Sequence, residues 1–248
     1  MTGITDAELT GGVSNNVFTV GGWTGRGMLV GAGGTDTVVS SRVANYLLSD
    51  TQLVALSGTT PVMTMALAGV GIAKLTGGTG NDTFTVSGWT GTGTIDGAGG
   101  TTDKIVAERD VGSTMLTNTT LVSTGLGALN LINVETAILS GGSSDNTLIA
   151  AKFTLGPVTL QGADSDDVLI GGTKKDSLDG GSGRDLLIGG LEADTLLGGT
   201  GEDILIGGTS SHMANVPALN AIMAEWKRTD LIYTDRVANL RDAGAPSN

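Results

Sequence analysis

Five aspartates recur every nine residues in the second half of the chain, and this spacing could build a row of metal sites: Asp167, Asp176, Asp185, Asp194 and Asp203. Each ends a stretch rich in glycine, and a leucine stands two places after each. Calcium takes about 6–8 hard oxygen ligands, which carboxylates and backbone carbonyls supply. Glycine can turn through positive φ and bring the carbonyls of a loop together. The spacing therefore predicts a series of calcium-binding loops.

The residues between the aspartates indicate the elements that hold these loops. From Gly162 the chain reads GADSDDVLI, GGTKKDSLD, GGSGRDLLI, GGLEADTLL and GGTGEDILI. Each apolar run is short and fits a strand with one inward leucine. A single nonapeptide cannot bury its leucine, but stacked turns bury a continuous ladder of leucines. Two nonapeptides are expected to form one turn, in the order loop, strand, loop, strand.

This pattern resembles the nonapeptide GGxGxDxUx of RTX (haemolysin-type) calcium-binding proteins, in which U is a large apolar residue. The resemblance implies an all-β fold, a right-handed parallel β-roll or β-solenoid, with several Ca²⁺ ions between loops eighteen residues apart. A calcium-free solenoid of Gly-Asp turns is the alternative. The metal ligands that the resemblance implies are Gly162, Asp164, Asp167, Gly171, Asp176, Gly180, Gly181, Gly183, Asp185, Gly189, Asp194, Gly198, Gly199, Gly201 and Asp203.

The two edges of the predicted roll differ in their fourth loop position, which is normally glycine. Loops from Gly162, Gly180 and Gly198 would share one edge, and loops from Gly171, Gly189 and Gly207 the other. On the second edge the fourth position is Lys174, Glu192 and Ser210, residues for which an unusual backbone conformation is costly. We therefore expect the stronger calcium sites on the first edge.

A longer repeat precedes the nonapeptides. LTGGVSNNVFTVGGWTG begins at Leu9, LTGGTGNDTFTVSGWTG at Leu75 and LSGGSSDNTLIAAKFTL at Leu139. Its alternating apolar and polar runs predict about seven further turns of the same parallel solenoid over 9–161. The repeat resembles those of large surface proteins of bacteria, which implies the C-terminal part of an exported or surface protein.

Few of these upstream loops carry a charged sixth position. The GGTGND loop from Gly77 has the full calcium pattern, so Asp82 is predicted as a metal ligand. Asn16 and Asn146 stand at the same position in their loops, and Asp36 in the loop from Gly31. Since asparagine keeps an oxygen but lacks the charge, these sites are expected to bind weakly or not at all.

After Gly208 the nine-residue period stops and a helical period begins. Leu219, Ile222, Met223 and Trp226 fall on one face of a helix begun by Asn215 and Pro217. A second helix is expected from Thr229 or Asp230. We expect both helices to cover the leucines of the last turn. The predicted domains are thus a solenoid of long repeats (1–161), a calcium-binding β-roll (162–210) and a two-helix cap (211–248).

Composition narrows the class of protein. The formal net charge is −12, so the protein would repel nucleic acid, and we do not expect nucleic acid as a partner. There is no cysteine, which excludes a disulfide framework and thiol catalysis. No run is long and apolar enough to span a membrane. The opening MTGITDAEL lacks the features of a signal peptide. The RTX resemblance implies an extracellular or cell-surface location reached by type I secretion.

No catalytic motif occurs in the sequence, so an enzyme is not expected. The function predicted is a calcium-binding structural solenoid: a stalk, adhesin segment or filament subunit. Two alternatives stay open. One is a glycan- or ice-binding module, suggested by Trp23, Trp89 and Phe153 at one repeat position and by threonine-rich strands. The other is the folding and export module of an enzyme. The solenoid has no obvious N-terminal cap, which favours self-association at that end.

Overall fold

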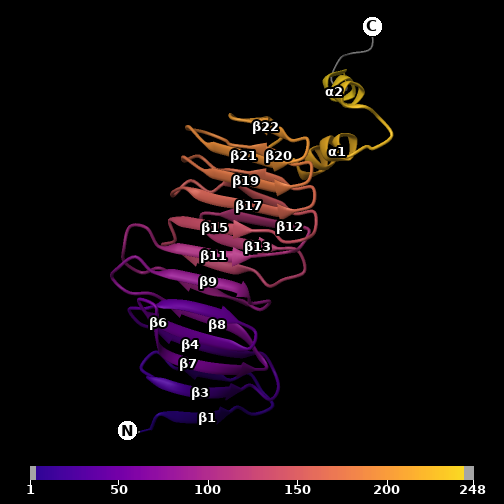
Figure 1. Ribbon diagram of the computed structural model, residues 1–248. Helices are drawn as coiled ribbons and strands as arrows, with labels where there is room; N and C mark the ends of the chain where they lie inside the picture. The colour runs from indigo at the N-terminus through magenta and orange to yellow at the C-terminus, as the bar shows by residue number, and fades with distance from the viewer. Residues whose placement is uncertain (1–3, 243–248) are drawn as a thin grey trace.

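The computed structural model describes residues 4–242, which form a column of stacked turns with two helices beside one end (Figure 1). Two sheets of eleven strands face each other along the column, and most neighbouring strands are parallel. This is the all-β solenoid with C-terminal helices that the sequence predicts. Sheet A contains β1 (Asp6–Thr10), β3 (Gly25–Val30), β7 (Thr60–Ala68), β6 (Gln52–Ser57), β5 (Asn45–Ser49), β9 (Thr83–Gly88), β11 (Lys104–Glu108), β15 (Thr136–Ser140), β17 (Val158–Asp164), β19 (Ser177–Ser182) and β21 (Thr195–Thr200).

Sheet B faces sheet A across the interior. The chain crosses between the two sheets by loops that lie along the two edges of the column. Sheet B contains β2 (Val17–Thr19), β4 (Asp36–Ser41), β8 (Val70–Thr76), β10 (Thr92–Asp96), β14 (Leu129–Ile132), β13 (Thr120–Ser123), β12 (Ser113–Thr117), β16 (Thr147–Lys152), β18 (Val168–Ile170), β20 (Leu186–Ile188) and β22 (Ile204–Ile206). We call the edge where loops lead from sheet A to sheet B the first edge, and the return edge the second edge.

The nonapeptide segment pairs with a strict register of one turn. Leu160 lies opposite Leu178, and Leu178 opposite Leu196, in sheet A. In sheet B, Leu169 lies opposite Leu187. The eighteen-residue turn predicted from the sequence therefore sets the pairing, because each leucine stacks on the leucine one turn earlier.

Two antiparallel excursions interrupt the upstream turns, where a purely parallel solenoid was expected. The strands β5, β6 and β7 fold back on one another in sheet A, and β12, β13 and β14 do so in sheet B. Their first turns fall in the shared segments LLSDTQLV and MLTNTTLV, where two residues separate one strand from the next. Such a short connection produces a hairpin, because a crossover to the other sheet needs more chain.

The long repeat changes sheets from one copy to the next. The strand after the Leu9 segment, β2, lies in sheet B, whereas the strand after the Leu75 segment, β9, lies in sheet A. The repeat therefore spans an odd number of passages between the sheets. As a result its loops alternate between the two edges and its aromatic residues cannot form one row.

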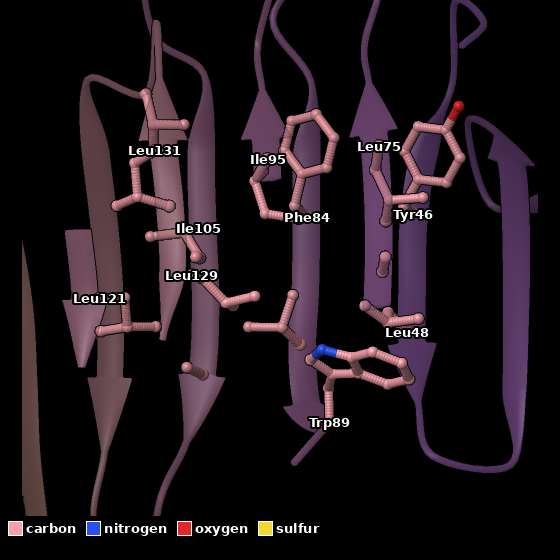
Figure 2. Close-up of a cluster of buried hydrophobic side chains, with 14 of the residues drawn as sticks. Tyr46, Leu48, Leu75, Phe84, Trp89, Ile95, Ile105, Leu121, Leu129 and Leu131 are labelled. Carbon is pink, nitrogen blue, oxygen red and sulfur yellow. The ribbon is translucent and has the colours of Figure 1, made fainter. Parts of the chain in front are cut away.

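Every second side chain of each strand points into the interior, and these side chains fill it (Figure 2). Tyr46 and Phe84 stack with ring centroids 5.6 Å apart, and Leu75 and Ile95 face them from sheet B. Trp89 is 1% exposed and Phe153 is fully buried, so these two residues widen the core at the edges. They are not free to stack against a sugar.

The helix α1 (Val216–Trp226) lies on the outer face of sheet B, and α2 (Tyr233–Asp242) follows it. Leu219 and Met223 pack on Val168, Leu186 and Ile188, whose side chains point away from the leucine ladder. The expectation that the helices cover the last turn's leucines is thus wrong for Leu205, which stays 47% exposed. α2 also begins later than predicted, at Tyr233.

The reason for this placement lies in the apolar triplets of alternate nonapeptides. VLI, LLI and ILI fall in sheet B, whereas SLD and TLL fall in sheet A. In each sheet B triplet the middle residue points inward and the outer two point to the other face. That face would expose a continuous apolar strip, and burying it against α1 removes it from water.

Candidate metal centre

The loops of the nonapeptide segment stack in two columns, as their spacing predicts. Loops from Gly162, Gly180 and Gly198 lie on the first edge, between β17 and β18, β19 and β20, and β21 and β22. Loops from Gly171 and Gly189 lie on the second edge. Each column therefore places the aspartates of successive turns one above another.

A carboxylate at the sixth loop position joins each loop to the one before it. Asp185 Oδ1 accepts a hydrogen bond from the backbone N–H of Asp167 at 2.8 Å, and Asp203 Oδ1 accepts from Asp185 N–H at 3.0 Å. On the second edge Asp194 Oδ1 accepts from Asp176 N–H at 2.9 Å. One oxygen of each carboxylate is thus used to hold the stack together.

The other carboxylate oxygen distinguishes two kinds of loop. In what we call closed loops, that oxygen, or the amide oxygen where asparagine stands at the sixth position, accepts a hydrogen bond from the N–H of the second loop residue, as Asp176 Oδ2 does from Gly172 at 2.5 Å. In open loops, the second and fourth residues have positive φ and that N–H does not reach the carboxylate. Closed loops start at Gly11, Gly77, Gly141 and Gly171; open loops start at Gly31, Gly97, Gly162, Gly180, Gly189 and Gly198.

Open loops leave buried oxygens without a partner. Oδ2 of Asp36, Asp167, Asp185 and Asp194 is buried and accepts no hydrogen bond. A buried ionised carboxylate is costly unless it is paired or bound to a metal. These oxygens are therefore the atoms in the structure that most require a cation.

Backbone carbonyls adjoin the same oxygens. A Cβ added to Gly162 would collide with both Asp167 Oδ2 and the carbonyl oxygen of Gly180, so both lie against the Gly162 Cα. Among residues 4–242 no three acidic or histidine side chains gather at one point. A cation here would take carboxylate oxygens from two loops and carbonyls for the rest. This donor set, all hard oxygen, fits calcium.

Burial disfavours charge on these aspartates when no cation is present. Desolvation, opposed in part by the hydrogen bond from Asn146 N–H, raises the pKa of Asp167 from its ordinary 3.8 to about 7. Desolvation likewise raises the pKa of Asp176 and of Asp185 to about 6. Neighbouring acidic residues on the same edge contribute to these raised pKa values. The stacked loops therefore concentrate negative charge where a cation would neutralise it.

The fourth loop position does not separate the edges as the sequence suggested. Lys174 lies in a closed loop and needs no positive φ, whereas Ser165 on the first edge has φ 76° and Glu192 on the second has φ 68°. Lys174 Nζ pairs with Glu192 Oε1 at 3.5 Å on the surface. What differs between the edges is the loop conformation: the loops from Gly162, Gly180 and Gly198 are all open on the first edge, whereas the Gly171 loop on the second edge is closed.

Two of the predicted metal ligands, Asp164 and Asp82, do not supply a free buried oxygen to an open loop. Asp164 is exposed at the end of β17, and its Oδ1 accepts a hydrogen bond from Ser182 Oγ at 2.8 Å, so its side chain lies apart from the open-loop oxygens. Asp82 is 5% exposed in a closed loop of the second edge. The other predicted residues lie in the two columns. Asp36 and Asp103, which the sequence reading did not select as ligands, stand in open loops; their shared segment GAGGT is the signal that could have identified them.

Stacked loops of this kind, with aspartates over glycine carbonyls, define a calcium-binding parallel β-roll. Residues 161–196 and 188–210 match the family model of the RTX calcium-binding nonapeptide repeat (4 copies). This segment is thus an RTX repeat, and RTX repeats bind calcium ions. No curated protein matches the chain. None of the described helices is long and apolar enough to cross a membrane.

Proposed function

We propose that this protein is a calcium-binding structural solenoid of a secreted or cell-surface bacterial protein, serving as a stalk, adhesin segment or filament subunit. The observation that carries the proposal is the column of open loops over 162–203, in which Asp167 and Asp185 each keep a buried oxygen without a protein partner. Calcium concentrations outside cells would fill such loops and rigidify the column. Export by type I secretion, typical of RTX proteins, agrees with this role.

The architecture supports a structural role over an enzymatic one. The interior is packed with apolar side chains along the column. The aspartates are accounted for as loop residues that recur with the turns. RTX β-rolls are typically structural.

A glycan-binding role has less support. Of the three aromatic residues at one repeat position, Trp89 and Phe153 are buried, and only Trp23 retains exposure. The alternation of the repeat between the edges also separates these residues. A single partly exposed tryptophan offers no extended stacking surface.

The N-terminal turn supports self-association as part of the same proposal. β1 pairs only with β3, which leaves its other side unpaired among the described residues. Leu9, Val13 and Val17 on this turn are 45%, 92% and 68% exposed. An unpaired strand beside exposed apolar side chains favours pairing with a second copy. Sedimentation of the calcium-loaded protein should show association that grows with concentration; a single monomeric species at all concentrations would refute it.

Small-angle X-ray scattering tests the structural role. With calcium, the protein should scatter as a rigid rod of constant cross-section. After chelation, the scattering should change to that of a rod attached to an expanded chain, because the 162–208 loops repel one another. Identical profiles in both states would contradict a calcium-stiffened column.

A further inference from the structure

The structure contains a loop pair outside the RTX match that repeats the geometry of an RTX pair. Loops from Gly77 and Gly97 follow β8 and β10 and lie one above the other on the second edge. The RTX pair from Gly171 and Gly189 lies further along that same edge. In both pairs the first loop is closed and the second open.

The carboxylates of the two pairs make matching contacts. Asp103 Oδ1 accepts a hydrogen bond from Asp82 N–H at 2.6 Å, just as Asp194 Oδ1 accepts one from Asp176 N–H at 2.9 Å. Asp82 Oδ2 accepts from Gly78 N–H at 2.5 Å, the same distance that joins Asp176 Oδ2 to its glycine. The insertion of one residue in the Gly97 loop leaves this arrangement intact.

The second oxygen of Asp103 is the independent sign of a missing ligand. Asp103 is 1% exposed, and within residues 4–242 its Oδ2 accepts no hydrogen bond. This oxygen lies against the Cα of Gly97, where the carbonyl of Asn133 from the next turn also lies. The carboxylate of a buried residue, with one oxygen beside a carbonyl and no donor on that oxygen, is an arrangement that a cation stabilises.

A further acidic side chain lies beside Asp103, and no described basic side chain forms an ion pair with this group. Glu135 Oε2 accepts a hydrogen bond from Asp103 N–H at 2.9 Å, which places a third acidic side chain on the next turn. Asp82, Asp103 and Glu135 form no ion pair with any described lysine or arginine. Backbone N–H groups donate to these three carboxylates, but no described lysine or arginine neutralises their charge.

We propose that the loops from Gly77 and Gly97 bind a further calcium ion between the carboxylates of Asp82 and Asp103. This inference rests on the proposed function, since it extends calcium binding from the RTX segment to the upstream solenoid. It also makes a prediction for the upstream turns: their stability depends on calcium as well.

Hydrogen exchange of the full chain locates the effect of calcium without any mutation. On addition of calcium, peptides covering 77–82 and 97–103 should gain protection, together with peptides of the RTX segment covering 180–203. If the RTX peptides gain protection and the upstream peptides do not, this inference fails alone. If neither gains protection, calcium binding itself, and with it the proposed function, fails.

Calcium stoichiometry measured by isothermal titration provides the second test. Asp103→Asn keeps an Oδ1 acceptor for Asp82 N–H but removes the charge, and should bind one calcium ion fewer than the wild type. Glu108→Gln removes one charge from the exposed end of the adjacent strand β11 and should bind the wild-type number. An unchanged stoichiometry in Asp103→Asn would overturn the proposal. If that variant misfolds, Asp82→Asn takes its place in the same comparison.

Discussion

Asp185 stands between two turns of the first edge: its Oδ1 accepts the N–H of Asp167, and its own N–H donates to Asp203. Its remaining oxygen is buried and has no partner. Asp176, at the same position on the second edge, has both oxygens occupied, by the N–H groups of Val158 and Gly172. These two aspartates share a repeat position but differ in what they leave free for calcium.

This difference predicts that the more destabilising of the two alanine substitutions, at Asp185 or at Asp176, changes when calcium is removed. Asp185→Ala should weaken calcium-dependent folding more than Asp176→Ala, because Asp185 serves the loops on both sides. In calcium-free buffer Asp176→Ala should cost more, since it leaves two backbone donors unpaired, at about 1–3 kcal/mol for each buried group. Calcium titration followed by circular dichroism gives both rankings. Equal losses in calcium would refute the asymmetry.

Asp36→Asn should stabilise the calcium-free protein. Asp36 is fully buried, and its Oδ2 has no partner. Asparagine keeps the Oδ1 acceptor for the N–H of Asn16 and removes the uncompensated charge. A gain of about 1–3 kcal/mol in the free energy of unfolding is expected from relief of the unpaired group. Asp6→Asn, at an exposed position of β1, is the control and should change stability little. A loss of stability in Asp36→Asn would contradict this prediction.

The calcium-free protein should be more stable in mild acid than at alkaline pH. The pKa values of Asp167, Asp176 and Asp185 are raised in the folded state to about 7, 6 and 6, above the ordinary 3.8. The folded state therefore binds more protons than the unfolded chain between pH 4 and 7, and stability falls as pH rises through this window. Melting of metal-free protein at pH 5 and pH 8 measures this. A higher melting temperature at pH 8 would show the opposite sign.

The packing of α1 on sheet B can be tested by Leu219→Ala. Leu219 is fully buried against the outward residues of β18 and β20. Truncating a buried leucine costs about 2–5 kcal/mol. Leu191→Ala, at a residue that is 52% exposed, should change stability little. Denaturant unfolding in saturating calcium compares them; equal midpoints would mean that α1 is not held on the sheet in solution.

The sequence predicts the nonapeptide segment well because glycine, aspartate and leucine each have one role per nine residues. Residues such as Leu178 and Leu187 could be placed inside from spacing alone. The upstream turns are harder to predict: the hairpins at Asp50 and Asn118 depend on the two-residue connection, a signal that the solenoid pattern obscured. Open and closed loops could not be distinguished, because the residue type at the fourth position does not decide between them: Gly80 stands in a closed loop and Glu192 in an open one.

The position of the helices was also within reach of the sequence. Val168, Leu186 and Ile188 flank the inward leucines, and apolar residues on both faces of a strand require cover on both faces. Ion pairs also join the helical segment to the first edge. Lys227 pairs with Asp145 and, at 3.4 Å, with Asp166. These partners lie far apart in sequence, so only the fold brings them together.

Far-ultraviolet circular dichroism of the full chain, recorded during exhaustive chelation and again after calcium is returned, shows whether calcium holds the column together. We expect the β-signal of the 162–208 segment to be lost in excess chelator and recovered with calcium, because binding restricted to the folded form stabilises it. The melting temperature should rise with calcium concentration. A spectrum and a melting curve that stay unchanged after complete removal of calcium would contradict the claim that calcium holds the column together.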